Sequence, residues 1–358
     1  SEDWLQGRYA EAAESYARAY EADTTFLRAL LVATAARGLS GDQAGADSLF
    51  GVIQPRREEL APYDRYRLDY GMAANRGDLG GRLRAARAGT ELVPSGTLRL
   101  ALVTALVDTN RPGEALESFE GIWEDIRGIG RGWVPLWANQ TEILHLLGNH
   151  EQELEIAREG KEVIPGVLHA LGLEARALAA LERTDELRAT LDEVLAAPDT
   201  PGTSAGVVLA ETAEELLAHG LAAFATEVLN RALTWLDRQP PDVLSTPESQ
   251  ALRGRLLYLG ERWSEAAEVF RGLLAPAPPS SRVLGYLGTS AARSGDSVAA
   301  REYSRRLADL NEPKRYGQKT LWRARIEAVL GNPEEATSLL RQAHGEGLGD
   351  GHRQVPRR

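Results

Sequence analysis

The residues whose spacing comes nearest to a catalytic motif are Gly202-Thr203-Ser204-Ala205-Gly206. A Gly-x-Ser-x-Gly run is the nucleophile elbow of hydrolases, in which a strand delivers the serine into a strained turn before a helix. The preceding residues, Ala196 to Asp199, include a proline and do not have the pattern of a strand. We therefore interpret the run as a flexible linker and predict a protein without catalytic activity. If the chain were an enzyme, Ser204 would be the only candidate nucleophile that this sequence pattern offers.

Histidine and cysteine usage gives no indication of a metal site. The chain has no cysteine, which excludes disulfides and thiolate ligands. His145 and His150 are five residues apart across an expected turn, and His344 and His352 flank a Gly-rich segment that contains Asp350. A metal site needs three or four converging ligands. We interpret both pairs as chance arrangements and predict no metal and no cofactor.

The acidic residues do not suggest acid–base catalysis either. Glu151, Glu153, Glu155 and Glu159 are typical of their distribution, along segments that we expect to be helical. No pair stands isolated in an apolar setting, the environment that prepares a carboxyl group for proton transfer. We interpret these glutamates as a solvated helix face.

Bulk composition limits the partners and leaves the compartment open. The net charge of −11 argues against a general nucleic-acid binder, because neutralising phosphates needs a basic surface. No apolar run approaches the ~18 residues of a membrane span. The chain opens at Ser1 with no methionine and no signal peptide, so we expect a processed chain or a segment of a longer one. Both a cytoplasmic and a processed secreted protein fit this composition.

A repeated motif organises the chain, and its clearest copy lies at residues 259–270. Its turns recur at a mean spacing of 36 residues, and the fifth residue after each turn is Ala or Leu in all ten copies. The first residues of the turns are Gly7, Gly41, Asp78, Asn110, Asn149, Glu182, Gly220, Glu261, Gly295 and Gly331. Seven residues before a turn the side chain is often small, as at Gly254 and Gly288, which lets two antiparallel helices approach closely. Apolar residues follow helical periodicity and no stretch alternates, so the sequence predicts an all-α protein without a sheet.

These features resemble the tetratricopeptide repeat, a helix–turn–helix unit of about 34 residues. The best match is at Leu284, Leu287, Gly288, Gly295 and Ala300, and a second is at Gly7, Tyr9, Ala12, Tyr16 and Ala19. The resemblance covers essentially the whole chain. It implies a right-handed α–α superhelix of about ten helix–turn–helix repeats.

More loosely, the chain is similar to the repeat arrays that bacteria append to Ser/Thr kinases, cyclases and DNA-binding activators. The similar stretches are Leu68-Asp69-Tyr70, the run from Asn110 to Ala115, and the run from His145 to Asn149. No catalytic or DNA-binding module of those proteins is visible in this sequence. The similarity implies one part of a larger bacterial regulator.

We expect a single array over residues 1–344, with an incomplete first repeat, and a Gly-rich, basic tail over residues 345–358. Repeat spacings of 39, 38 and 41 place extra residues near 128–133, 199–206 and 239–242. Trp133 and Trp137 flank the first of these inserts. We interpret them as aromatic plugs that fill the gap the insert opens, with ligand anchoring as the alternative.

The resemblance implies that first helices line a concave groove that binds a protein or peptide. By the positions of the family, the groove residues are Asn139, Glu142, His145, Arg255, Tyr258, Tyr286 and Arg293. Their types recognise backbone, carboxylate or apolar anchors. The alternative that Tyr258 and Tyr286 only pack between repeats stays open, because aromatic residues also fill cores. The predicted function is a non-catalytic scaffold for a protein or peptide partner.

Self-association into an oligomer or filament is the alternative function. An array without polar caps exposes surfaces at its ends that can stack on other copies. The residues expected there are Tyr9, Tyr16 and Tyr20 at the amino end, and Leu339 and Leu340 at the carboxyl end. A mass that grows with concentration would support this alternative.

Overall fold

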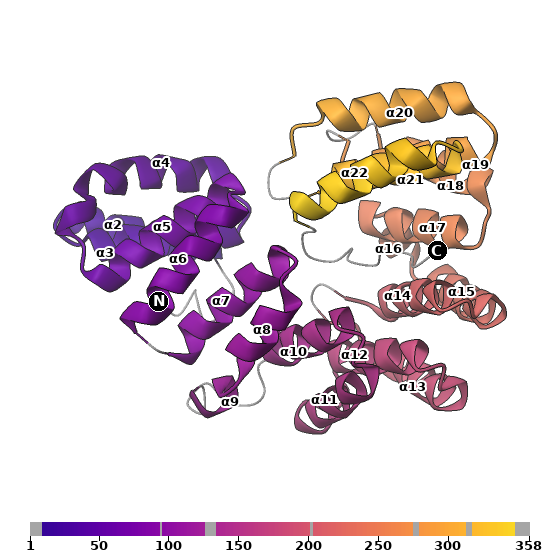
Figure 1. Cartoon of the computed structure of the whole chain (residues 1–358), viewed down its shortest axis with the longest axis horizontal. Coiled ribbons are helices and arrows are strands. Elements are labelled where there is room, and N and C mark those ends of the chain that lie inside the picture. The colour runs from indigo at the N-terminus through magenta and orange to yellow at the C-terminus, as the bar shows by residue number, and fades with distance from the viewer. Residues whose placement is uncertain are drawn as a thin grey trace. The chain divides into compact units, whose positions relative to one another are not determined.

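The computed structural model describes residues 9–93, 95–125, 134–200, 203–274, 279–312 and 317–347, and over them it is helical, with no strand (Figure 1). The structure therefore confirms the predicted all-α class. The chain separates into two compact units, residues 1–128 (unit 1) and residues 129–358 (unit 2). A single array over residues 1–344 with a separate tail stays a prediction.

Unit 1 contains one leading helix and three helical hairpins, formed by α3 with α4, α5 with α6, and α7 with α8. Its described elements are α2 (Tyr9–Ala22), α3 (Leu27–Leu39), α4 (Gln43–Ile53), η1 (Gln54–Glu59), α5 (Pro62–Arg76), α6 (Leu79–Leu92), α7 (Gly96–Asp108), α8 (Pro112–Phe119) and α9 (Ile122–Asp125).

Unit 2 contains six hairpins, formed by α10 with α11, α12 with α13, α14 with α15, α17 with α18, α19 with α20, and α21 with α22. Its described elements are α10 (Val134–Leu146), α11 (His150–Val163), α12 (Leu168–Ala180), α13 (Thr184–Ala196), α14 (Ala205–Ala218), α15 (Ala222–Asp237), α16 (Pro241–Leu244), α17 (Pro247–Leu259), α18 (Trp263–Gly272), α19 (Ser281–Arg293), α20 (Ser297–Asp309), α21 (Gln318–Val329) and α22 (Pro333–Gly345). Nine described hairpins preceded by α2 match the predicted repeat number, and each is a tetratricopeptide-like helix–turn–helix unit.

Each of the nine described hairpin turns contains one residue in the left-handed region. Six are glycines, and the others are Asn110, Glu182 and Glu261, with φ of 58°, 58° and 59°. The left-handed residue ends the first helix and lets the chain reverse within a few residues. The predicted turn positions are one residue late at two hairpins, where Gly77 and Gly148 adopt this conformation.

Replacing Gly220 with alanine is expected to lower the free energy of unfolding of unit 2 by about 1 kcal/mol. Gly220 has φ of +80°, and a Cβ there would meet no atom within 4 Å, so the cost comes from the backbone alone. Gly272→Ala is the matched control, because its site is equally open and carries no positive φ. Hydrogen exchange measures the change in stability of both variants, through the amides of α14 beside Gly220 and of α18, which contains Gly272. Equal effects from the two variants would contradict the role of φ.

Small residues bring the paired helices together as the sequence predicts. A Cβ on Gly254 would lie 2.7 Å from Cζ of Phe270 on the paired helix α18, and one on Gly288 would lie 3.1 Å from Cβ of Tyr303 on the paired helix α20. Eight of the ten Ala and Leu positions five residues after the predicted turns are at most 2% exposed, including Ala225 and Ala266. Leu83 and Ala336 are only partly buried. The repeated small residues are therefore core positions.

The described parts of the inserts are short and local. Thr200 and Thr203 form an isolated bridge, and one helical turn, α16, begins at Pro241. Trp137 is 1% exposed and lies against Gly160, which confirms it as an interior plug. Trp133 and the insert at 128–133 lie outside the described residues.

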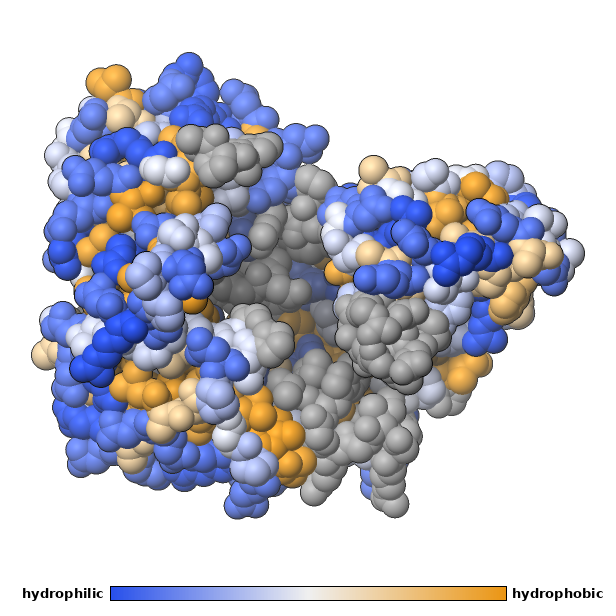
Figure 2. All heavy atoms as spheres, turned by 180° about the vertical axis from the view of Figure 1, so that it is seen from behind, coloured by the Kyte–Doolittle hydropathy of each residue, from blue (hydrophilic) through white to orange (hydrophobic). Residues whose placement is uncertain are grey.

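Among the described helices, none combines the length and the apolar composition that crossing a membrane requires. The exposed large hydrophobic side chains are spread along the sequence, from Phe26 to Val298. In Figure 2, hydrophilic residues cover most of the visible described surface and hydrophobic ones form smaller patches between them.

Candidate functional site

A buried carboxylate in unit 2, Glu153, is the centre of a polar cluster formed by several helices. Glu153 lies in the first turn of α11, and its side chain is 0% exposed. Its Oε2 is 2.9 Å from Nδ1 of His145 on α10 and 3.1 Å from Nδ1 of His150 on α11. The α10–α11 turn thus brings both imidazoles onto one oxygen atom.

The other oxygen of Glu153 binds the next repeat. The Nε of Arg176, on α12, donates to Oε1 of Glu153 at 2.7 Å. Nη1 of the same guanidinium donates to Oε2 of Glu142, on α10, at 2.7 Å. Arg176 therefore joins two carboxylates that come from the two helices of the preceding hairpin.

A second buried carboxylate extends the cluster to α14. Glu215 is 3% exposed, and its Oε2 lies 3.6 Å from Nε2 of His145. Its Oε1 lies 2.9 Å from Nε2 of His219, the residue that caps the C-terminus of α14. The ring centroids of His150 and His219 are 5.8 Å apart. Three histidines and two buried carboxylates therefore meet where α10, α11 and α14 end or begin.

Burial by itself would raise the pKa of Glu153. The charge of Arg176 and the hydrogen bonds from His145 and His150 outweigh that cost and hold the pKa well below its usual range. Arg176 shows the converse balance: desolvation disfavours its charge, but Glu153 and Glu142 more than compensate, so its pKa is raised. Each of the two groups therefore stabilises the charged form of the other, and they form a buried ion pair.

A second polar surface of unit 2 lies on the first helices of successive hairpins, which contact one another in the order α12, α14, α17 and α19 (Figure 1). Glu211, on α14, is reached by solvent. Desolvation by the surrounding protein raises the pKa of its carboxyl group; Arg255 opposes the shift and Glu214 reinforces it. Arg176 and Arg282 also act on this carboxyl group. Side chains from four helices thus converge around one accessible carboxylate.

The structure divides the predicted groove residues into accessible and internal ones. Asn139, Glu142, His145 and Tyr258 are partly exposed, and Arg293 is exposed, with its guanidinium 5.5 Å from the ring centroid of Trp263. Arg255 is 8% exposed and donates from Nε to Oε1 of Glu214 at 2.8 Å. Tyr286 is 3% exposed and stacks on Phe270 at 4.7 Å. Tyr286 therefore packs between repeats, while the groove assignment as a whole stays a prediction.

The sequence interpretation missed most of the polar cluster. Expecting a solvated face was wrong for Glu153, which shares the buried stripe of α11 with Ala157 and Gly160. The helical spacing of these three residues is the signal that could have found it. Sequence spacing relates His145 only to His150. His219 and Arg176 come from other repeats, so local spacing does not indicate that they lie near these histidines.

The serine of the Gly-x-Ser-x-Gly run has a structural role. The Oγ of Ser204 accepts from the backbone N–H of Val207 at 3.4 Å, so this serine caps the N-terminus of α14. Gly202, in the same motif, lies outside the described residues.

At the predicted ends, Tyr9, Tyr16 and Tyr20 are partly buried on α2, and the Tyr20 hydroxyl accepts from Nη1 of Arg56 at 3.3 Å. Leu339 is 4% exposed, and Leu340 packs against Leu321 and Ala343. Self-association through these residues stays a prediction.

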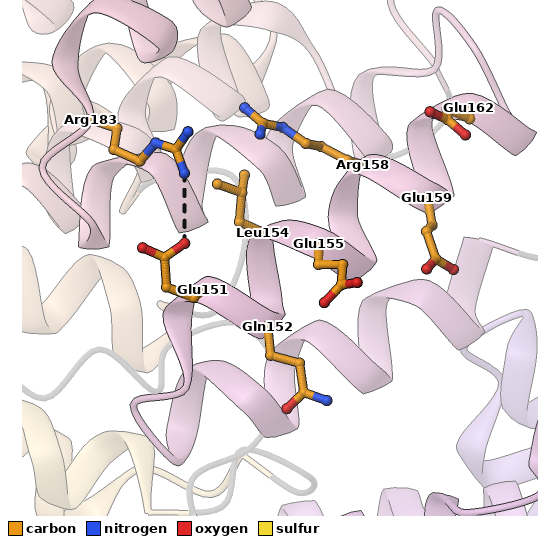
Figure 3. Close-up of a pocket in the computed structure, with 8 residues that line it drawn as sticks. All are labelled: Glu151, Gln152, Leu154, Glu155, Arg158, Glu159, Glu162 and Arg183. Carbon is orange, nitrogen blue, oxygen red and sulfur yellow. Dashed lines mark ion pairs between the residues drawn. The ribbon is translucent and has the colours of Figure 1, made fainter.

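The second helices form a different surface, with a shallow hollow of about 810 Å³ along α11 (Figure 3). Glu151, Glu155, Glu159 and Glu162 line it, and Arg183 pairs with Glu151 at 3.6 Å. Ion pairs then connect successive second helices, for example Arg158 of α11 with Glu186 of α13 at 2.6 Å. This surface is a network of solvated charges that links neighbouring repeats.

No family model matches the sequence, and no curated protein matches it. Among solved structures, a tetratricopeptide repeat protein from Parabacteroides merdae is similar, with 14% identity and a TM-score of 0.45, over 79% of this chain and 98% of that chain. The human IFIT1 dimer with PPP-AAAA has 13% identity and a TM-score of 0.44, over 88% and 72% of the two chains. The human IFIT1 dimer with m7Gppp-AAAA has 12% identity and a TM-score of 0.47, over 95% and 79%. Similarity at this level says nothing about the ligand of this chain.

Proposed function

We propose that this protein is a non-catalytic scaffold that binds a segment of a partner protein along the first helices of unit 2. Helical repeat folds present extended surfaces and generally act as interaction scaffolds. The proposed surface runs over α12, α14, α17 and α19. Its accessible charged centre is Glu211, and Arg255 and Tyr286 support it from within.

The observation that supports this proposal is the environment of Glu211. Glu211 is an exposed residue, yet desolvation by the neighbouring helices raises the pKa of its carboxyl group. Poor hydration of a carboxylate strengthens its pairing with a cation, because water competes less for the charge. Glu214 raises the pKa further, so a cation beside Glu211 would relieve both effects.

We infer that the partner segment carries a lysine or arginine that pairs with Glu211. Arg255 is already bound to Glu214 at 2.8 Å, and burial outweighs the arginines that act on Glu211, so the pKa of Glu211 stays raised. A cationic side chain placed there makes a charge-assisted hydrogen bond, which is stronger than a neutral one. The apolar remainder of the segment would contact the partly exposed ring of Tyr258.

Selection from a random peptide library on the full chain tests this proposal. The expected result is a family of peptides with a basic residue, whose affinity falls about tenfold, or by about 1.4 kcal/mol, in Glu211→Gln. Glu155→Gln is the matched control, because Glu155 is an exposed glutamate on the second-helix surface of the same unit. Its affinity should not change. Equal losses in both variants, or no enriched peptide, would contradict the proposal.

Light scattering over a hundredfold range of concentration separates partner binding from self-association. A constant mass of one chain, 38.9 kDa, agrees with a scaffold for another protein. A mass that grows with concentration would instead favour assembly of copies and would direct the mutations to α2 and α22.

A further inference from the structure

We propose that His145, His150 and Glu153 form a binding site for one divalent transition-metal ion of the Zn²⁺ class. Their three candidate ligand atoms all lie within 4.8 Å of one another. Two are imidazole nitrogens and one is a carboxylate oxygen, the donor types that zinc binds in sites with an open fourth position. None of the three donors belongs to the proposed Glu211 surface, and this inference does not depend on the proposed function.

Two of the three distances between the donors are close to those around a small ion. In a tetrahedral site with bonds of 2.0–2.1 Å, neighbouring ligand atoms are about 3.3 Å apart. Here Nδ1 of His145 and Nδ1 of His150 lie 2.9 Å and 3.1 Å from Oε2 of Glu153. An outward shift of a few tenths of an ångström would open these pairs to metal-binding distances. Because His150 and Glu153 are on the same turn of α11 and His145 ends α10, small side-chain rotations supply that shift.

The surroundings of the three donors resemble the outer shell of a metal site. A metal-bound imidazole usually directs its other nitrogen at a carboxylate, which fixes its orientation and its tautomer. If Nδ1 of His145 binds the ion, its Nε2 carries the proton, and that atom faces Oε2 of Glu215 at 3.6 Å. Glu215 is itself held by Nε2 of His219 at 2.9 Å. The free oxygen of Glu153 is likewise held, by Nε of Arg176 at 2.7 Å.

The net negative charge of the cluster also favours the binding of a cation. Glu142, Glu153 and Glu215 are in direct contact with the cluster and contribute three negative charges, and Arg176 contributes one positive charge. With neutral imidazoles, two negative charges remain, and Glu153 and Glu215 are almost fully buried. An uncompensated buried charge is costly. One divalent ion balances these two charges, and two protons on the imidazoles are the competing way to do so.

The donor set selects among metals. Imidazole ligands favour Zn²⁺, Cu²⁺, Ni²⁺, Co²⁺ and Fe²⁺. Ca²⁺ prefers six to eight oxygen ligands, and Mg²⁺ demands an octahedron of oxygen atoms. Two nitrogens and one carboxylate oxygen meet neither requirement, so we expect no competition from these two ions.

Metal titration of the untagged full chain, stripped with EDTA and dialysed, tests the proposal. Calorimetry with Zn²⁺ should give one equivalent bound with micromolar or tighter affinity, and Mg²⁺ should give no heat of binding. Co²⁺ should give visible absorption bands of a tetrahedral site with nitrogen ligands, and Zn²⁺ should abolish them. Absence of saturable Zn²⁺ binding near one equivalent would overturn the proposal.

Variants locate the site. His150→Ala should weaken Zn²⁺ binding at least a hundredfold, and Glu215→Gln should weaken it ten- to a hundredfold by removing the outer carboxylate. His169→Ala is the control, because His169 is an exposed histidine on α12 of the same unit, and it should bind as the unchanged chain does. If His150→Ala fails to fold, Glu215→Gln and the Co²⁺ spectrum still decide. Unchanged affinity in both cluster variants, or an equal loss in His169→Ala, would refute the assignment.

Discussion

Replacing Arg176 with methionine is expected to lower the free energy of unfolding of unit 2 by about 3 kcal/mol at pH 7. Methionine keeps much of the volume but removes the guanidinium that binds both Glu153 and Glu142. Glu153 is 0% exposed, so its charge would be left without its strongest partner. The effect stays near the low end of the range for broken buried pairs, because His145 and His150 still bind Oε2.

The defect should shrink as the pH falls, because the pKa of Glu153 is lowered in the folded protein. A carboxyl group of this kind stabilises the fold above its unfolded pKa, near 4.3, and the contribution is lost as the pH falls towards the lower folded value. Without the charge of Arg176, the pKa of Glu153 is expected to rise from its lowered value, so the variant loses less stability on protonation of Glu153 than the unchanged chain does. The difference between the two proteins is therefore largest near pH 7 and narrows below about pH 5.

Hydrogen exchange of the α11 and α12 amides, with EDTA present, measures the difference in stability at pH 7. Denaturant titrations measure it at lower pH. Arg176→Met combined with Glu153→Gln should recover at least half of the lost stability, since the orphaned charge is gone. The matched control is Arg188→Met. Arg188 pairs with Glu227 on the exposed second-helix surface, so its loss should cost less than about 1 kcal/mol. A defect in Arg176→Met that is constant with pH would contradict the role given to Glu153.

Local spacing was sufficient to predict the fold because each hairpin is made from contiguous sequence. The turn positions at Asn110, Glu182 and Glu261 follow from the repeat spacing and from the Ala or Leu five residues later, although none of the three is a glycine, and all three adopt the left-handed conformation. The same spacing identified Ala225 and Ala266 as core residues. These features depend on contacts within one hairpin, where the order of residues fixes which side chains meet.

The polar cluster could not be predicted in the same way, because its members come from several hairpins. Arg176 meets Glu153 from 23 residues away and Glu142 from 34 residues away, and the repeat spacing varies between these hairpins. Which charge faces which depends on the rotation between stacked repeats, and residue types do not specify that rotation. The sequence indicates the burial of Glu153 only through its helical spacing from the other buried residues of α11. Glu153 takes a position there that an apolar residue would normally fill.

Replacing Gly285 with alanine is expected to destabilise unit 2 by about 2–3 kcal/mol, although alanine is the better helix former. Gly285 lies inside α19, and a Cβ there would lie 2.1 Å from Cδ2 of Trp322 on α21. Trp322 is 3% exposed and packs at 4.7 Å from the ring of Tyr286, so its ring has little room to retreat. Overpacking at this contact should separate α19 from α21 and expose their shared core.

The background Trp322→Ala should reverse the sign of the Gly285→Ala effect. Trp322→Ala alone should cost about 3–5 kcal/mol, because it leaves a large cavity. With the ring gone, the new methyl group meets no aromatic atoms, and the helix propensity of alanine should make the second change neutral or favourable by up to about 1 kcal/mol. Hydrogen exchange of the α19 and α21 amides in the four proteins gives the coupling energy. If Gly285→Ala costs the same in both backgrounds, the cause lies in the α19 backbone, and the close approach of α19 to Trp322 does not set the packing of these repeats.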